Sequence, residues 1–354
     1  MQLKYLETSI LKWFKFEKRD LPFRWTKDPY KIWLSEVMLQ QTKVVTAIPY
    51  YNKWLKKYPT LFSVSQENLN NLLKLWEGLG YYSRCRNFHQ AAKIVCKKYD
   101  GKVPSDWETF ISLPGVGDYT ASAVLSIAFG KKYVTIDGNV RRVIYRLLGL
   151  KRATPFNEKR AKKTLERLIP NISPGDFNQS MMELGALICN PRNPKCGSCP
   201  LNYMCKAFKS KNPENYPQRI KKLKAPTYQY IAGIIRHNKK FLIIKRNENS
   251  MLGGLWELPN FRVDVLSDLE KIYQEKIKDL FNIKIMKFNT IGIISHKYSH
   301  FTATVKVFNC VLFNLESFNG KKYKWISLKE VTLYPFSKIN HKIFGMMRKK
   351  NINV

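Results

Sequence analysis

Glu36 is the first residue of this chain whose surroundings suggest chemistry. It lies in an amphipathic stretch and shares a helical face with Trp33 and Gln40, so we expect it to point into a partly apolar site. Desolvation there would raise the pKa of Glu36 and keep it protonated, as a general acid requires. A solvated surface glutamate is the alternative interpretation.

Asp137 is the second such residue, in the run Thr-Ile-Asp-Gly-Asn-Val directly before a helical pattern. Its simplest interpretation is a helix N-cap. A capping carboxylate can also be functional, and we expect this one to lie in a cleft below the glycine hairpin of residues 113–117. One protonated acid and one carboxylate are what glycosidic bond cleavage uses: the first protonates the leaving group, and the second stabilises an oxocarbenium-like sugar. The same chemistry applies to a nucleoside once its base is flipped out of the duplex.

Four of the seven cysteines lie within seventeen positions, in the spacing C-x6-C-x2-C-x5-C. These four are Cys189, Cys196, Cys199 and Cys205. Thiolates this close together in a reducing compartment are metal ligands more often than disulfides. The uneven pairs differ from the knuckles of zinc sites, and all-thiolate ligation also suits a cubane iron–sulfur cluster. Spacing alone favours iron–sulfur and leaves zinc as the alternative.

A glycine hairpin, Leu-Pro-Gly-Val-Gly, separates two helical patterns at residues 113–117. Gly115 and Gly117 would let the backbone approach a ligand closely, and the free N–H groups of the next helix favour a phosphate oxygen. This arrangement is typical of a helix-hairpin-helix that grips the DNA backbone without reading bases. A plain glycine turn between two helices is the alternative.

The charge of the chain points to the same class of partner. Sixty-two Lys and Arg against 26 Asp and Glu give a formal net charge of +36, which would concentrate a polyanion such as nucleic acid. Codon bias toward lysine is the alternative origin of this charge. No stretch approaches the 18 apolar residues of a membrane span, and residues 1–18 lack the features of a signal peptide. We therefore expect no membrane partner and a cytoplasmic location.

A chain of 354 residues is long for a single core, and its pattern changes once. Residues 1–205 show helical periodicity, residues 206–226 are basic and proline-containing, and residues 227–354 are rich in β-forming runs. The expected helices of the first domain include 68–76, 88–99, 121–129, 140–148, 159–168 and 178–187. The expected strands of the second cover 230–236, 241–246, 283–294 and 301–313, with a helix over 266–281. The sequence predicts a mainly α domain, a linker and an α+β domain.

The glycine hairpin, Asp137 and the four-cysteine loop together resemble the endonuclease III superfamily of helix-hairpin-helix base-excision glycosylases. The resemblance implies a helical catalytic domain, a hairpin that grips DNA, and a [4Fe–4S] cluster held by the four cysteines. The runs 35–42 and 78–84 are similar to the adenine DNA glycosylase branch, the MutY type. Membership of this branch would mean hydrolysis of the N-glycosidic bond of adenine mispaired with 8-oxoguanine, or with guanine, in double-stranded DNA.

The resemblance also assigns roles to single residues. Glu36 resembles the acid that protonates the imidazole ring of adenine, and Asp137 the carboxylate that stabilises the sugar cation. The other matched positions are Asn139 beside Asp137, Gln179 at the flipped adenine, and Gln41, Leu79 and Tyr81, which resemble the residues that wedge into the base stack. Tyr119 stands where strand-nicking glycosylases usually carry a Schiff-base lysine, which implies a monofunctional enzyme.

The second domain resembles the Nudix-like domain of the same branch through the run Gly-Leu-Trp-Glu-Leu-Pro at 254–259. Residues 266–281 lack the acidic Arg-Glu-x-x-Glu-Glu run that holds Mg²⁺ in Nudix hydrolases, so a binding domain without hydrolase activity is expected. The run Tyr298-Ser299-His300 resembles the loop, often Phe-Ser-His, that probes the oxidised guanine. An ordinary strand turn is the alternative for this loop.

These observations favour a monomeric, nucleoid-associated adenine DNA glycosylase over two rivals. The first rival is a bifunctional endonuclease III-like glycosylase with lyase activity, against which Tyr119 and the second domain argue. The second is a non-enzymatic iron–sulfur DNA-binding protein, which would not need Glu36 and Asp137 together at these positions.

Overall fold

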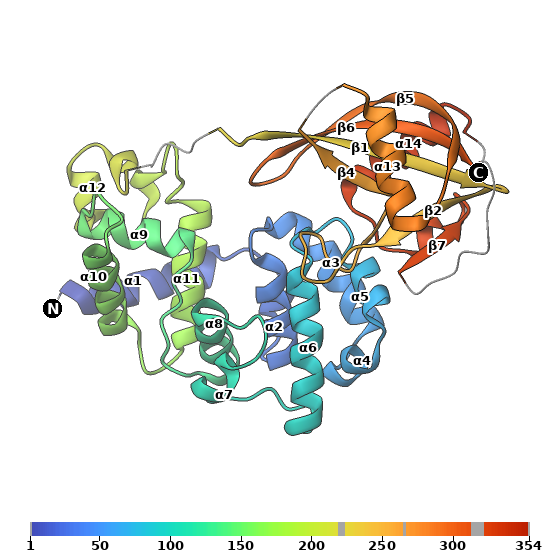
Figure 1. The fold of residues 1–354 in the computed structure, drawn as a ribbon. Helices are drawn as coiled ribbons and strands as arrows, with labels where there is room; N and C mark the ends of the chain where they lie inside the picture. Colours follow the sequence, from blue (N-terminus) through green and yellow to red (C-terminus); the bar gives the residue numbers. More distant parts are fainter. Residues whose placement is uncertain (1, 219–223, 265–266, 313–321, 353–354) are drawn as a thin grey trace. The chain divides into compact units, whose positions relative to one another are not determined.

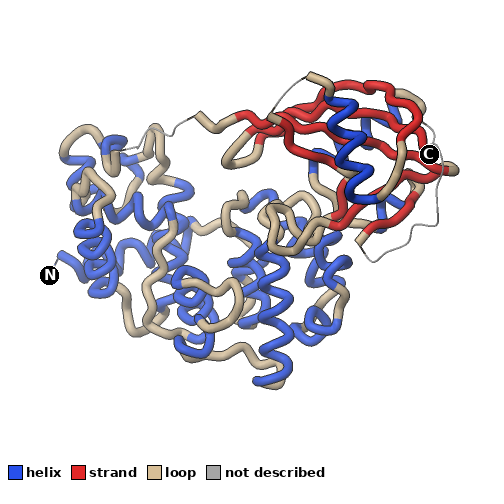
Figure 2. Tube along the Cα trace, in the orientation of Figure 1, coloured by secondary structure: helices blue, strands red, loops and turns tan. Residues whose placement is uncertain are grey.

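The structure is a computed structural model that describes residues 2–218, 224–264, 267–312 and 322–352 (Figure 1). The chain divides into two compact units. One consists of Met1–Gln66 and Asn87–Lys221, and the other of Glu67–Arg86 and Lys222–Val354. Helices make up the first unit, and a sheet with helices the second, so the predicted combination of a mainly α domain and an α+β domain is confirmed (Figure 2).

The helical unit contains no strand among its described residues. Its α-helices are α1 (Gln2–Glu17), α2 (Pro29–Leu39), α3 (Val44–Lys57), α4 (Leu61–Gln66), most of α6 (Ser83–Lys98), α7 (Trp107–Ile111), α8 (Asp118–Phe129), α9 (Gly138–Leu148), α10 (Pro155–Leu168), α11 (Pro174–Leu187) and α12 (Lys206–Lys209). Short 3-10 turns lie at Pro22–Arg24, Cys196–Ser198, Asn202–Met204 and Pro213–Asn215. Neighbouring residues determine where α2 begins. The Asp28 side chain accepts hydrogen bonds from the backbone N–H groups of Tyr30 and Lys31, and Pro29 occupies the first helical position.

The core of the helical unit positions the residues of interest. Helices α1, α9, α10 and α11 share one apolar core that includes Ile10, Ile144 and Phe177. Helix α2 is buried on nearly all sides, and its Trp33 packs edge-on against Phe88. The amphipathic pattern expected around Glu36 is therefore that of a central helix, which brings the glutamate into the interior.

The second unit is built around a mixed seven-stranded sheet in the order β3-β2-β1-β6-β5, with β4 paired to β1 and β7 to β2. Its strands are β1 (Thr227–His237), β2 (Lys240–Lys245), β3 (Trp256–Glu257), β4 (Asn260–Val263), β5 (Ile285–Lys297), β6 (Thr302–Leu312) and β7 (Tyr323–Ile326). Strands β1 and β6 run parallel, and the other pairs are antiparallel. The predicted strands match β1, β2, β5 and β6, whereas Phe313 and Leu266, the ends of two predicted elements, lie outside the described residues.

Two helices cover the opposite faces of this sheet (Figure 1). Helix α13 (Leu269–Phe281) packs through Tyr273 on the face that holds Ile231 of β1. Helix α14 (Lys338–Lys349) packs through Phe344 on the face that holds Ala232. Neighbouring residues of β1 therefore point to opposite faces of the sheet, and both are buried because a helix covers each face.

The division into units differs from the predicted limits of 1–205, 206–226 and 227–354. Residues 206–215 contain α12 and a 3-10 turn of the helical unit. The segment Glu67–Arg86, with α5 (Leu69–Leu75), belongs instead to the second unit. There the Glu77 carboxylate accepts a hydrogen bond of 2.7 Å from the backbone N–H of Phe336 and pairs with His341. Residues in contact across some 260 positions share no sequence pattern. The sequence therefore could not predict that Glu67–Arg86 belongs to the second unit.

Within the described residues, the chain has no helix with the length and apolar character needed to cross a bilayer.

Candidate active site and cysteine loop

The helical unit contains a cavity that gathers most of the residues singled out for catalysis. It has about 1170 Å³ of empty space, part of which is open solvent, and it is lined by side chains from α2, α8, α11 and the start of α9. The predicted site residues on its wall are Glu36, Tyr119, Asp137, Asn139 and Gln179. These five residues come from four separate stretches of sequence and meet at one space large enough for a nucleobase.

Glu36 is the buried acid of this cavity, with only 6% of its surface exposed. The Tyr119 hydroxyl donates a hydrogen bond of 2.8 Å to its Oε2. Burial raises the pKa of Glu36 to about 7, and the charge of Asp137 adds to this, while the Tyr119 hydrogen bond and the charge of Arg24 act in the opposite direction. A carboxyl with a pKa near 7 can hold a proton and release it at physiological pH, as a general acid must.

Asp137 is both the N-cap of α9 and a wall residue of the cavity. Its Oδ1 accepts a hydrogen bond of 2.7 Å from the Val140 N–H, and its Oδ2 accepts one of 2.9 Å from the Asn139 side chain. The segment before Asp137 is held by Asn178, whose Oδ1 accepts a hydrogen bond of 3.0 Å from the Thr135 N–H. The capping and the functional interpretations of Asp137 are therefore compatible.

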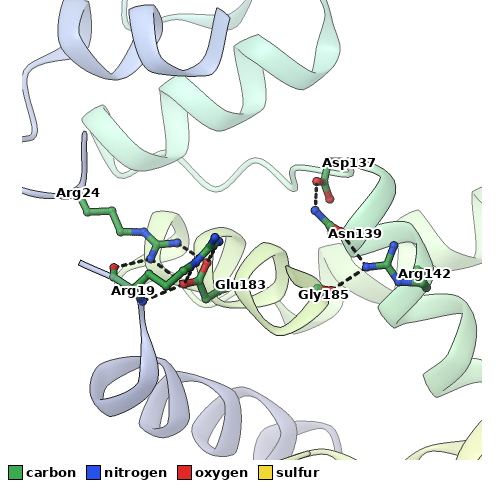
Figure 3. A network of polar contacts seen from close by, with 7 residues as sticks. All are labelled: Arg19, Arg24, Asp137, Asn139, Arg142, Glu183 and Gly185. Carbon is green, nitrogen blue, oxygen red and sulfur yellow. Dashed lines mark hydrogen bonds and ion pairs between the residues drawn. The ribbon is translucent and has the colours of Figure 1, made fainter. Parts of the chain in front are cut away.

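Asn139 begins a polar chain that leads away from the cavity (Figure 3). The Arg142 guanidinium donates to the Asn139 Oδ1 at 2.8 Å and to the Gly185 carbonyl at 2.7 Å. Its Nε donates at 2.7 Å to the carbonyl of Cys189, the first residue of the cysteine loop. This chain fixes the Asp137 carboxylate to α11 and to the loop, so its orientation does not depend on the cap alone.

Glu183, Arg19 and Arg24 are wall residues that sequence reasoning missed. The Glu183 carboxylate, 1% exposed, receives hydrogen bonds from both guanidinium groups (Figure 3). Burial alone would raise the pKa of Glu183, but the bonds from Arg19 and Arg24 outweigh it and hold the pKa at about 2. The partners lie 159 and 164 positions apart, so no spacing rule could have found them.

This ion cluster leads to a stability prediction. Glu183→Gln should lower the free energy of unfolding by about 3 kcal/mol near pH 7, because it leaves the largely buried Arg24 without its carboxylate. The folded-state pKa is below the ordinary 4.5, so the loss should be complete above pH 4.5 and fade as the pH falls toward 2. Denaturant unfolding at several pH values measures both. Asp264→Asn, which removes the exposed pair with Arg262, is the control and should change stability by less than about 1 kcal/mol.

The glycine hairpin connects α7 to α8. Gly115 has a φ of +79°, and a Cβ added to it would lie 2.7 Å from the Asn87 Cβ, so both the backbone and the space require glycine. Gly117 is the exposed N-cap of α8, and a Cβ there would meet nothing within 4 Å. The exposed start of α8 can therefore receive a large anion at its N–H groups.

The four cysteines follow α11 and surround two 3-10 turns before α12. Burial, with a smaller contribution from the charges of the other three thiols, raises the pKa of the Cys199 thiol to about 12. Arg146 donates a hydrogen bond of 3.3 Å to the Cys189 Sγ and so brings positive charge to the group. No set of three or more His, Cys, Asp or Glu that could hold a single metal ion occurs among the described residues.

The residues predicted to contact DNA outside the cavity occur in both units. Gln41, exposed in the helical unit, follows α2 with a φ of +57°. In the second unit, Leu79 is buried, and the Tyr81 hydroxyl shares a hydrogen bond of 2.6 Å with the Ser299 Oγ. Two motifs that the sequence offered separately are thus in contact. Tyr298 and His300 lie in the same β5–β6 turn, with His300 exposed.

Comparisons with known families agree with this arrangement. Residues 34–171 match the model of the HhH-GPD superfamily base excision DNA repair protein, and residues 230–346 match that of the NUDIX domain. Among solved structures, a thermostable thymine-DNA glycosylase is similar with a TM-score of 0.55 and 32% identity, over 59% of this chain and 97% of that one. An endonuclease III trapped as a covalent intermediate with DNA is similar with a TM-score of 0.51 and 27% identity, over 59% of this chain and 97% of that one.

Three relatives whose match extends over most of this chain are adenine DNA glycosylases. An adenine DNA glycosylase of Buchnera aphidicola subsp. Schizaphis graminum is 37% identical over 340 residues, which is 93% of this chain and 94% of the relative. The adenine DNA glycosylase of Buchnera aphidicola subsp. Baizongia pistaciae is 36% identical over 90% of each chain. The human adenine DNA glycosylase is 31% identical over 86% of this chain and 66% of its own length.

Proposed function

The chain belongs to the adenine DNA glycosylases of base-excision repair, the MutY type, and we propose that Glu36 and Asp137 carry out its reaction. In this proposal the enzyme hydrolyses the N-glycosidic bond of adenine mispaired with 8-oxoguanine, or with guanine, in duplex DNA. The observation that supports it most is a buried acid with a pKa near 7 beside a second carboxylate in one cavity. Two carboxyl groups with different environments are the requirement for glycosidic cleavage.

Glu36 acts as the general acid. Its proton passes to a ring nitrogen of the flipped adenine, which lets the base accept the electron pair of the breaking bond and leave neutral. The Tyr119 hydrogen bond to Oε2 orients the carboxyl and leaves Oε1 to face the base. Gln179, on the cavity wall, is placed to contact the adenine.

Asp137 acts on the sugar. As the C1′–N bond breaks, positive charge develops on the 2′-deoxyribose ring, and the carboxylate stabilises it until water adds. The Val140 N–H and the Asn139 amide hold one oxygen each, so the carboxylate needs no reorganisation as the charge develops. Pre-organised charge of this kind is usually the largest single contribution to such a barrier.

Tyr119 supports a monofunctional reaction. A lyase needs an amine that forms a Schiff base with the sugar, and a phenol whose hydroxyl is bonded to Glu36 cannot supply one. The product in this proposal is an intact strand with an abasic site.

The surrounding surfaces hold the duplex and test the opposite base. The hairpin at Gly115 and Gly117 takes a backbone phosphate, and Gln41, Leu79 and Tyr81 occupy the stack that the adenine leaves. The Tyr298–His300 turn contacts the 8-oxoguanine. The enzyme works as a monomer at the nucleoid in this scheme.

The four cysteines hold a [4Fe–4S] cluster in this proposal. The group, when bound, would cross-link the loop through its iron–sulfur bonds. Arg146 would neutralise part of its charge from the interior side, and the Arg142 bond to the Cys189 carbonyl would couple loop position to Asp137.

The proposed acid predicts a pH dependence. The single-turnover excision rate should be flat at low pH and fall about tenfold per pH unit above pH 7, because only protonated Glu36 is active. The Tyr119 hydrogen bond stabilises the carboxylate, so Tyr119→Phe should move the falling limb to higher pH. Quenched-flow rates from pH 5 to 9 for both proteins measure this. A falling limb that stays in place in Tyr119→Phe would show that another group titrates.

The experiment that tests the whole proposal is single-turnover excision on duplexes with one 8-oxoguanine:A pair, quenched with and without alkali. Controls carry A:T, G:A or an oxidised pyrimidine. The expected result is strand breaks at the adenine only after alkali treatment, in the order 8-oxoguanine:A, then G:A, and none at A:T. Breaks without alkali that persist in Tyr119→Phe, or breaks at the pyrimidine lesion, would assign the chain to the lyase branch.

A further inference from the structure

The helical unit contains a second cavity next to the one that holds Glu36 and Asp137. It has about 810 Å³ of empty space, part of it open solvent, and it is lined by side chains from α8, from the segment before α9, and from α9 and α10. Tyr119 lines both cavities, so the two adjoin at this side chain. None of the other residues that line the second cavity takes part in the reaction proposed above.

One short segment of the chain contributes to the walls of both cavities. Ile136 lines the second cavity, whereas Asp137, the next residue, lines the first. At the start of α9, Asn139 lines the first cavity and Arg141 the second. A sugar on which Asp137 acts therefore lies at the border between the two cavities. Its base enters the first cavity, and the phosphates bonded to its O3′ and O5′ atoms stay outside that cavity.

The charged side chains of the second cavity leave one positive charge uncompensated. Arg141 is paired with Glu158, with 3.1 Å between the Arg141 Nε and the Glu158 Oε1. The remaining charges are the ammonium groups of Lys159 and Lys162 and the carboxylate of Asp118, two positive against one negative. Within the described part of the chain, neither ammonium group has an ion-pair or hydrogen-bond partner. Both are therefore available to a ligand.

This excess charge restricts the chemistry of the ligand. A phosphodiester carries one negative charge, whereas a phosphate monoester carries about 1.5 to 2 at neutral pH. A lysine ammonium is a compact charge with three donors, which suits phosphate oxygens and reads no base. Val134 and Ile136 give the cavity an apolar wall, which the carbon atoms of a sugar can contact. The ligand that matches is the sugar-phosphate backbone of a DNA strand.

We propose that Lys159 and Lys162 bind a phosphodiester bonded to the sugar of the flipped adenosine and so hold this nucleotide at the border of the two cavities. The two lysines lie three positions apart on α10 and therefore on one side of the helix. The identity of the sugar rests on the proposed function. The site is separate from the glycine hairpin, whose phosphate contact uses backbone N–H groups. The contact exists before and during bond cleavage, so it contributes mainly to affinity.

The salt dependence of duplex binding by the full-length protein is the first test. The duplex carries 8-oxoguanine opposite a non-cleavable adenine analogue, so no excision occurs. Lys159→Gln/Lys162→Gln should bind about tenfold more weakly and lower the slope of log affinity against log salt by about one. Arg160→Gln/Arg167→Gln removes the same charge from exposed residues of α10 that do not line the cavity, and this control should leave the slope almost unchanged. Equal losses in the two double variants would overturn the proposal.

Single methylphosphonates identify the phosphate that the lysines bind. Each one removes the charge of one phosphate and leaves the rest of the strand unchanged. At one of the two phosphates bonded to the sugar of the adenine analogue, the substitution should weaken binding by the wild-type protein about tenfold. The same substitution should have almost no effect on Lys159→Gln/Lys162→Gln, because the partner of that phosphate is already lost. Equal effects on the two proteins at both phosphates, including no effect at either, would show that the lysines do not contact this nucleotide.

Single-turnover excision separates binding of the nucleotide from cleavage of its bond. For Lys159→Gln/Lys162→Gln, the rate at low enzyme concentration should fall about tenfold, and excess enzyme should restore most of it. If excess enzyme restored none of the rate, the lysines would act on cleavage or on the fold, and the proposed contact would be wrong. Absence of the methylphosphonate effect would remove this proposal and leave the proposed reaction intact. A wild-type rate in Glu36→Gln would remove the proposed reaction, whereas the binding measurements need no excision.

Discussion

Glu36→Gln should lower the single-turnover rate of adenine excision by about a thousandfold and leave duplex affinity within about twofold. The amide keeps the shape and a hydrogen bond to Tyr119, but it has no proton with a pKa near 7 to give to the base. The rate is measured on an 8-oxoguanine:A duplex with enzyme in excess, and the affinity with a non-cleavable adenine analogue.

Two observations separate catalysis by Glu36 from a structural role. The variant should unfold at the same or a higher temperature at pH 8, because the wild-type protein must bury a charge there and the variant does not. Glu17→Gln, an exposed carboxyl at the end of α1, is the matched control and should keep full activity. If affinity and rate fall together, Glu36 shapes the cavity and another group supplies the proton.

The part of this site that could be predicted consists of residues whose role depends only on positions close to them in the sequence. Asp28 and Asp137 cap helices a few positions away, and Gly115 meets the demand of its own φ angle, so each is visible in a short stretch of sequence. The burial of Glu36 follows from its place among apolar residues of α2. The sequence pattern predicted one apolar face for this helix, whereas the folded bundle buries nearly all faces of it.

The part of the site that the sequence could not predict consists of contacts between residues far apart along the chain. Glu183 is held by Arg19 and Arg24, and Glu77 by groups of the second unit, across separations of 159 to 264 positions. An ion pair has no periodicity, and its free energy depends on burial that only the folded chain creates. The same reason explains why the contact between Tyr81 and Ser299 was not foreseen, although both residues were.

Asp137→Asn should reduce the excision rate by about a hundredfold or more with little change in stability. Asparagine caps a helix as well as aspartate does, so the bond from the Val140 N–H survives. The negative charge that opposes the developing sugar cation is lost, and removal of one pre-organised electrostatic group costs about 10²–10³ in rate. Asp137→Ala should lose the same rate and, in addition, about 1 kcal/mol of stability.

The comparison of these two variants separates the capping role from the catalytic one. Single-turnover rates and denaturant unfolding are measured for both, with Asp106→Asn as the control, because Asp106 caps α7 through the Thr109 N–H and does not line the cavity. Asp106→Asn should change neither quantity. If Asp137→Asn kept the wild-type rate while Asp137→Ala lost it, the carboxylate would act only through the geometry of α9. A slow variant with full stability would instead locate the effect in the charge, and the loss of that charge should also lower the pKa of Glu36 and move the pH profile to lower pH.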